Sequence, residues 1–221
     1  MFNVRKVAQM AAYFLHSNDD GPMDHVKLMK LMYLSDRRAL ATFRFPISDD
    51  TYCSMRRGPV LEKTLSLFEG RAEPNVQAVW NLWISGKENH QIRPNRKVNI
   101  DDFDRFAGAE LEVMGKTFSY FGGWDWKDLV EYTHGLPEWE NLGKDAKKTD
   151  SKPLSLTRIM NALVDVVTKE PLSPDEVAST VRYMEEVEPN VRLITTVKDF
   201  NSRKRPDPKV SADALEELLG V

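Results

Sequence analysis

The chain has 221 residues, of which 41% are hydrophobic and 29% are charged, and its formal net charge is -3. This composition is typical of a soluble globular protein and excludes a fibrous repeat or a wholly disordered chain. No apolar run approaches the roughly 18 residues that a membrane-spanning helix requires, and residues 1–20 alternate polar and apolar groups, unlike a signal peptide. The single cysteine, Cys53, cannot form an intramolecular disulfide. We therefore expect a cytoplasmic protein that does not enter a membrane.

The charges are distributed unevenly along the chain. Residues 1–100 carry 15 basic and 10 acidic side chains, whereas residues 101–221 carry 16 and 24. A dedicated nucleic-acid binder needs a concentrated basic face for counterion release, which scattered lysines do not supply. The counts thus argue against nucleic acid as a partner. The acidic half would suit a basic protein, although ordinary solvated surface explains the same counts.

Two helices are predicted in the first 43 residues. Residues 4–15 carry apolar side chains at helical spacing and are followed by the turn formers of residues 18–22. Asp24 is the predicted N-cap of a second helix that runs to Phe43. Its apolar face is too broad for a helix with a single contact, so we expect it to be the central helix.

The next segment predicts a strand, a helix and a hairpin. Residues 51–56 alternate like a short strand. Proline is favoured at the first helical position, so Gly58-Pro59 predicts the start of a helix that Gly70 ends. Residues 79–94 contain two strand-like segments around a polar turn, which predicts an inserted hairpin.

Two further helices are predicted before a polar loop. The acidic pair at residues 101–102 suits the first turn of a helix that the glycine pair at residues 122–123 ends. Asp125 caps a short helix that ends at Gly135. Residues 143–153 are polar and aperiodic, which indicates a flexible loop or linker.

The C-terminal part of the chain predicts four more elements. Ser155 caps a helix whose apolar positions continue to Val167. A capping box that begins at Ser173, with proline at the first helical position, predicts a helix over residues 174–188. Beyond it, residues 191–197 suit a strand and residues 211–220 suit a short terminal helix.

These elements together predict a mainly α fold with a small antiparallel β-sheet or hairpin, of the α+β class. We expect a single globular helical domain over residues 1–168, with the hairpin near residues 79–94 inserted in it. Residues 169–221 form a C-terminal extension.

Catalytic and metal chemistry has little support in the sequence. Cys53 and the four histidines stand in no recognised nucleophile motif, and neither a CxxC nor an HxxxH spacing occurs. A lone cysteine in an alternating strand is most often a small buried hydrophobe. We expect no metal and no cofactor, and we keep a hydrolase or transferase that uses Cys53 or His134 as an alternative.

Arg56 and Arg57 place two guanidinium groups directly before Gly58-Pro59. Such a pair can hold an anion. The segment lacks the glycine-rich loop of a nucleotide site, and Pro59 removes a backbone donor. We therefore favour a structural role at a strand-to-helix turn, or binding to a carboxylate of a partner, over a phosphate site.

Three motifs occur in order: KLMKLMY at residues 27–33, RRGPV at residues 56–60 and THGLPEW at residues 133–139, in which Glu138 separates the proline from the tryptophan. Together they resemble the Panacea domain family, also known as SocA-like proteins, over roughly residues 5–165. The residues that carry the resemblance or stand beside it are Lys27, Lys30, Tyr33, Arg56, Arg57, Gly58, Pro59, Thr133, His134, Pro137 and Trp139.

The resemblance implies a non-enzymatic antitoxin of a bacterial or phage toxin-antitoxin pair, which neutralises a toxin by direct binding. Some members of the family look like adaptors that bring a toxin to a protease. The implied partners are therefore a cognate toxin encoded nearby and, for an adaptor, a protease. The motif residues either contact that partner or stabilise the fold, and turn and apolar residues more often do the latter. Regulation of its own operon is a third alternative, without a basic reader domain to support it.

Overall fold

Eight α-helices, one 3₁₀ turn and two small antiparallel sheets make up the described part of the chain. The computed structural model describes residues 2–143, 145–147, 149–165 and 167–184. The prediction of a mainly α fold with a small antiparallel sheet is confirmed.

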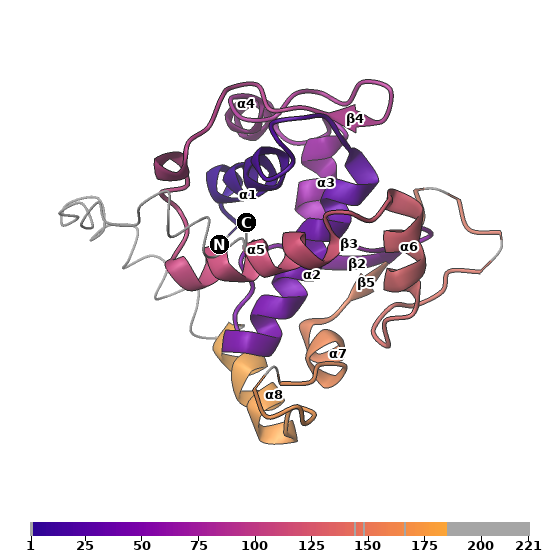
Figure 1. Cartoon of the computed structure of the whole chain (residues 1–221). Coiled ribbons are helices and arrows are strands. Elements are labelled where there is room, and N and C mark those ends of the chain that lie inside the picture. The colour runs from indigo at the N-terminus through magenta and orange to yellow at the C-terminus, as the bar shows by residue number, and fades with distance from the viewer. Residues whose placement is uncertain (1, 144, 148, 166, 185–221) are drawn as a thin grey trace.

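The first two helices form the centre of the core. In α1 (Val4–His16) the side chain of Asn3 accepts a hydrogen bond from the backbone of Lys6, and residues 7–15 are all buried. In α2 (His25–Phe43) the N-cap is Asp24, as predicted. Figure 1 shows α2 running through the middle of the molecule. Because α2 has neighbours on several sides, its apolar face is broader than a surface helix needs.

A three-stranded sheet packs against α2, in the order β3-β2-β5. Its strands are β2 (Tyr52–Met55), β3 (Gly58–Leu61) and β5 (Ser151–Leu154), and both pairings are antiparallel. Met55 pairs with Gly58, so only Arg56 and Arg57 form the turn between β2 and β3. A second sheet pairs β1 (Met23–Asp24) with β4 (Gln91–Ile92).

The prediction that Gly58-Pro59 opens a helix is wrong. Both residues lie in β3, where Pro59 pairs with Ser54, and α3 (Glu62–Phe68) begins only after the strand. Proline lacks a backbone N–H, and β3 tolerates it because it is an edge strand of the sheet. Gly58 has φ +94°, a conformation that side chains with a β-carbon rarely adopt.

The predicted hairpin near residues 79–94 is only partly present. A helix, α4 (Pro74–Asn81), occupies the start of its first strand, and Pro74 opens this helix. Isolated bridges join Ile84 to Pro94 and Glu88 to Gln91 around the predicted turn. The second segment contributes β4, whose strand partner is β1. The apolar side chains that suggested a strand are buried in part within α4, at Trp80, and in part directly after it, at Trp83 and Ile84.

Of the two helices after this segment, the first is shorter than predicted and the second matches the prediction. A 3₁₀ turn, η1 (Ile100–Asp102), holds the acidic pair, and α5 (Gly108–Phe121) starts six residues later, so the predicted continuous helix is interrupted. The short helix capped by Asp125 is confirmed as α6 (Trp126–His134). Both α5 and α6 pack against α2.

The predicted loop at residues 143–153 is wrong at its end, because residues 151–153 belong to β5 and pair with β2. After it, Ser155 caps α7 (Leu156–Asn161) as predicted, but the helix ends well before Val167.

The capping box at Ser173 is confirmed as the start of α8 (Pro174–Arg182). This helix lies beside the C-terminal end of α2, where Arg44 contacts Glu176 at 3.1 Å and the rings of Phe45 and Tyr183 meet edge to face. Three predictions lie outside the described residues: the end of the helix, at residues 185–188, the strand at residues 191–197 and the terminal helix at residues 211–220. The division of the chain at residue 168 stays a prediction.

Candidate functional site

The three motif segments meet on one side of α2. The first lies on α2 itself, the second forms the β2–β3 turn with the start of β3, and the third ends α6 and continues into the following segment. β3 packs against both α2 and α6. Segments more than 70 residues apart in the sequence are thereby brought together (Figure 1).

Gly58 is the point at which these segments approach most closely. A β-carbon on Gly58 would lie 2.6 Å from Oγ1 of Thr133 and 2.7 Å from Nζ of Lys30. No real β-carbon makes contacts that short, so the motif requires glycine at this position for both its space and its backbone conformation.

The two motif lysines anchor α2 to backbone carbonyl groups. Lys30 is fully buried, and its Nζ donates a hydrogen bond to the carbonyl oxygen of Pro59 at 2.8 Å. Burial lowers the pKa of Lys30 to about 7. Lys27 donates to the carbonyl oxygen of Gly122, at the end of α5, at 2.6 Å. Both lysines therefore connect α2 to its neighbours.

Tyr33 belongs to a buried polar group around Glu138. The Tyr33 hydroxyl donates to Oε1 of Glu138 at 3.0 Å, and Nε of Arg37 donates to the same oxygen at 2.6 Å. Glu138 is fully buried, whereas Arg37 keeps partial access to solvent and also donates to the carbonyl oxygen of Ala162. The inserted acidic residue of the third motif thus holds that segment onto α2.

His134 and Trp139 contact the β2–β3 turn and stabilise it. Their rings stack with centroids 4.0 Å apart, and Nε1 of Trp139 donates to the carbonyl oxygen of Met55 at 3.1 Å. Burial and the charge of Lys30 lower the pKa of His134, while a hydrogen bond with the backbone of Arg56 acts in the opposite direction. These contacts fix the turn from which two arginine side chains emerge.

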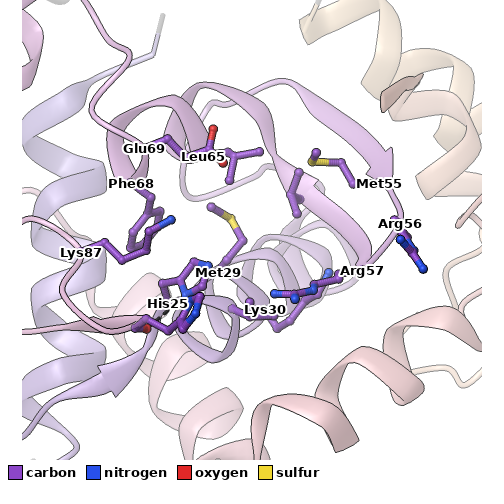
Figure 2. A pocket seen from close by; sticks show the side chains of 13 residues that line it. His25, Met29, Lys30, Met55, Arg56, Arg57, Leu65, Phe68, Glu69 and Lys87 are labelled. Atoms are coloured by element: carbon purple, nitrogen blue, oxygen red, sulfur yellow. Dashed lines mark hydrogen bonds between the residues drawn. The ribbon is translucent and has the colours of Figure 1, made fainter. Parts of the chain in front are cut away.

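Beside this turn lies a pocket of about 500 Å³, shown in Figure 2. Its size falls within the range of roughly 300–1,000 Å³ that is usual for binding sites. α2, α3, the β2–β3 hairpin and the loop before β4 supply its walls. The residues that line it are His25, Val26, Met29, Lys30, Met55, Arg56, Arg57, Val60, Leu65, Phe68, Glu69, Lys87 and His90.

Basic side chains dominate the polar part of this pocket. Arg56, Arg57 and Lys87 are exposed, and none of them forms an ion pair with another described residue. The guanidinium of Arg57 lies over the ring of Trp126, 5.3 Å from its centroid. The one acidic lining residue, Glu69, is paired with Arg71. The pocket therefore carries positive charge that no described residue balances.

Two stacked histidines close one end of the pocket. The rings of His25 and His90 lie 5.5 Å apart at an interplanar angle of 21°, and Nδ1–H of His25 donates to the carbonyl oxygen of His90 at 3.1 Å. Burial lowers the pKa of His25, and the nearby charge of Lys87 acts in the same direction. At neutral pH this end of the pocket presents a neutral imidazole from His25 and the positive charge of Lys87.

The predicted motif residues thus divide into two groups. Lys30, Arg56 and Arg57 line the pocket, whereas Thr133, His134 and Trp139 do not and instead support its wall. Tyr33, Lys27, Gly58 and Pro59 also hold the segments together, and Pro137 is exposed in the turn after α6.

Sequence reasoning named only three of the thirteen lining residues of the pocket as candidate site residues, and it also missed Arg37 and Glu138. Arg37 could have been found from its position four residues after Tyr33, on the same face of the predicted helix. In the sequence, Glu138 stood out only because it interrupts the third motif, and no pattern indicated its contacts with Tyr33 and Arg37. His25, Lys87 and His90 carry no sequence signal, because the pairing of β1 with β4 brings them together.

The structure offers little support for chemistry at Cys53. Its side chain is buried in β2 and does not line the pocket, and burial raises the pKa of the thiol to about 12. A thiolate is the reactive form of cysteine, and this environment disfavours it. Within the described ranges, no group of three or more His, Cys, Asp or Glu side chains could hold a metal ion. None of the described helices has both the length and the apolar composition needed to cross a bilayer.

A family model described as antitoxin SocA-like, Panacea domain, matches residues 28–140. This range includes all the motif residues except Lys27 and all the lining residues of the pocket except His25 and Val26. No curated protein and no solved structure matches the chain significantly.

Proposed function

Because the chain belongs to the SocA-like antitoxin family with a Panacea domain, we propose that it neutralises a cognate toxin by direct protein-protein binding. The toxin is encoded close to it in a bacterial or phage genome, and the complex forms in the cytoplasm. Binding is stoichiometric and requires no cofactor and no chemical step by this chain.

The pocket beside the β2–β3 turn is the observation that best supports a binding surface. Exposed arginine side chains are frequent among the residues that dominate binding energy at protein interfaces. Here Arg56 and Arg57 emerge from a two-residue turn whose flanking residues Met55 and Pro59 accept hydrogen bonds from Trp139 and Lys30. A rigid turn loses little conformational entropy on association, which favours its use as a contact surface.

Co-expression with each neighbouring open reading frame tests this proposal. A toxic neighbour should stop growth alone, permit growth with this chain, and co-purify with it at a fixed ratio. Titrating the antitoxin against a fixed amount of toxin then separates binding from catalysis, because a binder needs equimolar amounts whereas an enzyme acts at a small fraction of that. Failure of every neighbour to be toxic or to bind would contradict the proposal.

The adaptor alternative has a distinct signature in the same experiment. An adaptor lowers the cellular amount of the toxin, and its protection is lost in a host that lacks the relevant protease. Direct neutralisation leaves the amount of toxin unchanged and is independent of that protease.

A further inference from the structure

The pocket beside the β2–β3 turn has two chemically different sides. Figure 2 shows His25, Lys30 and Arg57 along one side and Leu65 and Met55 along the other. The side chain of Met29 lies between them in this view. An occupant that satisfies both sides must carry a negative charge and an apolar group next to each other.

The basic side of this pocket has cationic side chains that can bind an anion. Arg57 is positioned by the ring of Trp126, yet no carboxylate of the described residues pairs with it. A planar guanidinium binds a carboxylate through two parallel hydrogen bonds, which makes arginine the preferred partner of that group. Lys87, which also lines the pocket, is equally without an ion pair in the described part of the chain.

Lys30 adds charge beneath the surface of the pocket. Its Nζ has one hydrogen-bond acceptor among the described residues, the carbonyl oxygen of Pro59. A bound carboxylate would favour the protonated form of this lysine, since an opposite charge nearby stabilises the ammonium ion. Protonation of Lys30 would then add positive charge to the pocket when an anionic occupant binds.

The acidic residue at the rim does not cancel this charge. Glu69 forms its ion pair with Arg71, which is not a lining residue. The neutral lining residues near Glu69 are apolar, and they include Leu65 and Phe68. This side accordingly suits a branched or aromatic side chain, whose burial removes apolar surface from water.

We propose that this pocket holds an anchor segment of a protein partner, in which an acidic side chain lies next to a large apolar side chain. Arg57 binds the carboxylate, Lys87 adds positive charge from the opposite wall of the pocket, and Met29, Leu65 and Phe68 contact the apolar group. The proposal deepens the proposed function, on which it rests for its choice of a protein as the occupant. A single-stranded nucleic acid is less suited, because the pocket offers no run of exposed aromatic rings on which bases could stack.

Selection from a random dodecapeptide phage library on the immobilised full-length chain tests the pocket without any toxin. The wild-type chain should enrich peptides with Asp or Glu adjacent to Leu, Ile, Met or Phe. The double variant Arg57→Glu, Lys87→Glu should not enrich them. The matched control Lys97→Glu, Arg182→Glu makes the same charge change at exposed residues that do not line the pocket.

A synthetic copy of the most enriched peptide then gives dissociation constants by fluorescence polarisation. We expect at least tenfold weaker binding to the Arg57→Glu, Lys87→Glu variant, and an affinity within twofold of the wild type for the control variant. Replacing the acidic residue of the peptide by its amide, or its apolar neighbour by alanine, should each weaken binding at least fivefold.

Three results would overturn the inference: no enrichment above background, enriched peptides without an acidic residue, or equal binding to the pocket variant. Displacement of the peptide by a 12-nucleotide single strand at lower concentration would assign the pocket to nucleic acid instead. Since no toxin is present in this assay, these results are independent of the growth test of the proposed function.

Discussion

The phenol of Tyr33 donates a hydrogen bond to Oε1 of Glu138 at 3.0 Å, across a separation of 105 residues in the sequence. Tyr33 lies in the first motif and Glu138 interrupts the third. Arg37 donates to the same carboxylate at 2.6 Å. This buried contact joins α2 to the segment that supports the β2–β3 turn, and it connects the family motifs to the geometry of the pocket.

Glu138→Ala should therefore lower the free energy of unfolding by about 3–5 kcal/mol, because it leaves Arg37 and Tyr33 without their buried acceptor. Glu138→Gln keeps an acceptor oxygen and should cost less. A double-mutant cycle with Tyr33→Phe, measured by urea unfolding, should give a coupling energy of about 0.5–3 kcal/mol. Strictly additive effects would show that the contact does not contribute.

Gly58→Ala should destabilise the fold by roughly 2–4 kcal/mol, because it adds steric overlap with Lys30 and Thr133 to an unfavourable backbone conformation. Gly70→Ala is the matched control. Gly70 also has positive φ, at +65°, but its β-carbon would meet nothing within 4 Å. The difference between the two midpoints of thermal unfolding isolates the steric part, and similar midpoints would contradict the close approach.

Lys30 should make stability depend on pH near neutrality. Its pKa of about 7 in the folded chain is lower than the roughly 10.4 of an unfolded lysine, so between these values the unfolded state binds more protons. The free energy of unfolding should rise with pH in this window, by up to about 1.4 kcal/mol per unit.

Lys30→Met removes the titrating group and should flatten this rise, measured by urea unfolding between about pH 7 and pH 8.5. The window stops there because Cys53, with its thiol pKa raised to about 12 by burial, acts in the opposite direction once an unfolded thiol begins to ionise. Parallel curves for the wild type and the variant would exclude a titration of Lys30 in this range.

Charge reversal at the pocket should leave the fold intact. Arg57 and Lys87 are exposed and make no ion pair with the described residues, so Lys87→Glu should change the free energy of unfolding by less than about 0.5 kcal/mol. Arg57→Glu also removes the cation–π contact with Trp126 and should cost at most about 1 kcal/mol. A larger loss, measured by urea unfolding against the exposed loop variant Lys97→Glu, would show that the main role of these side chains is to stabilise the fold.

Helix starts marked by a side-chain N-cap were the most predictable part of the fold. Asp24, Asp125, Ser155 and Ser173 each cap a helix as their positions in the sequence indicate. A cap is a local interaction between a side chain and backbone N–H groups two or three residues on, so local sequence contains the information.

Strands and their pairing were less predictable because they depend on distant segments. Pro59 favours a helix start and an edge strand equally well by its φ angle, and the pairing with β2 decides between them. Residues 151–153, with the sequence Ser-Lys-Pro, show no strand pattern and form a strand because they pair with β2. The hairpin that does form, at residues 52–61, is therefore not the one that the composition of residues 79–94 indicated.

The candidate site was predictable only in its motif residues. Arg56 and Arg57 stood out as two adjacent cations before Gly58, and the structure places both at the pocket. The opposite wall comes from Lys87 and His90, whose position depends on the pairing of two-residue strands. No periodicity or cap marks such short strands in a sequence.

Titration calorimetry of the purified toxin with this chain tests the central claim most directly, once co-expression has identified the toxin. The account predicts a one-to-one complex with the wild type and with Arg182→Glu, and at least tenfold weaker binding, about 1.4 kcal/mol, with Arg57→Glu. Equal affinity of all three proteins, or neutralisation of the toxin without a measurable complex, would contradict it.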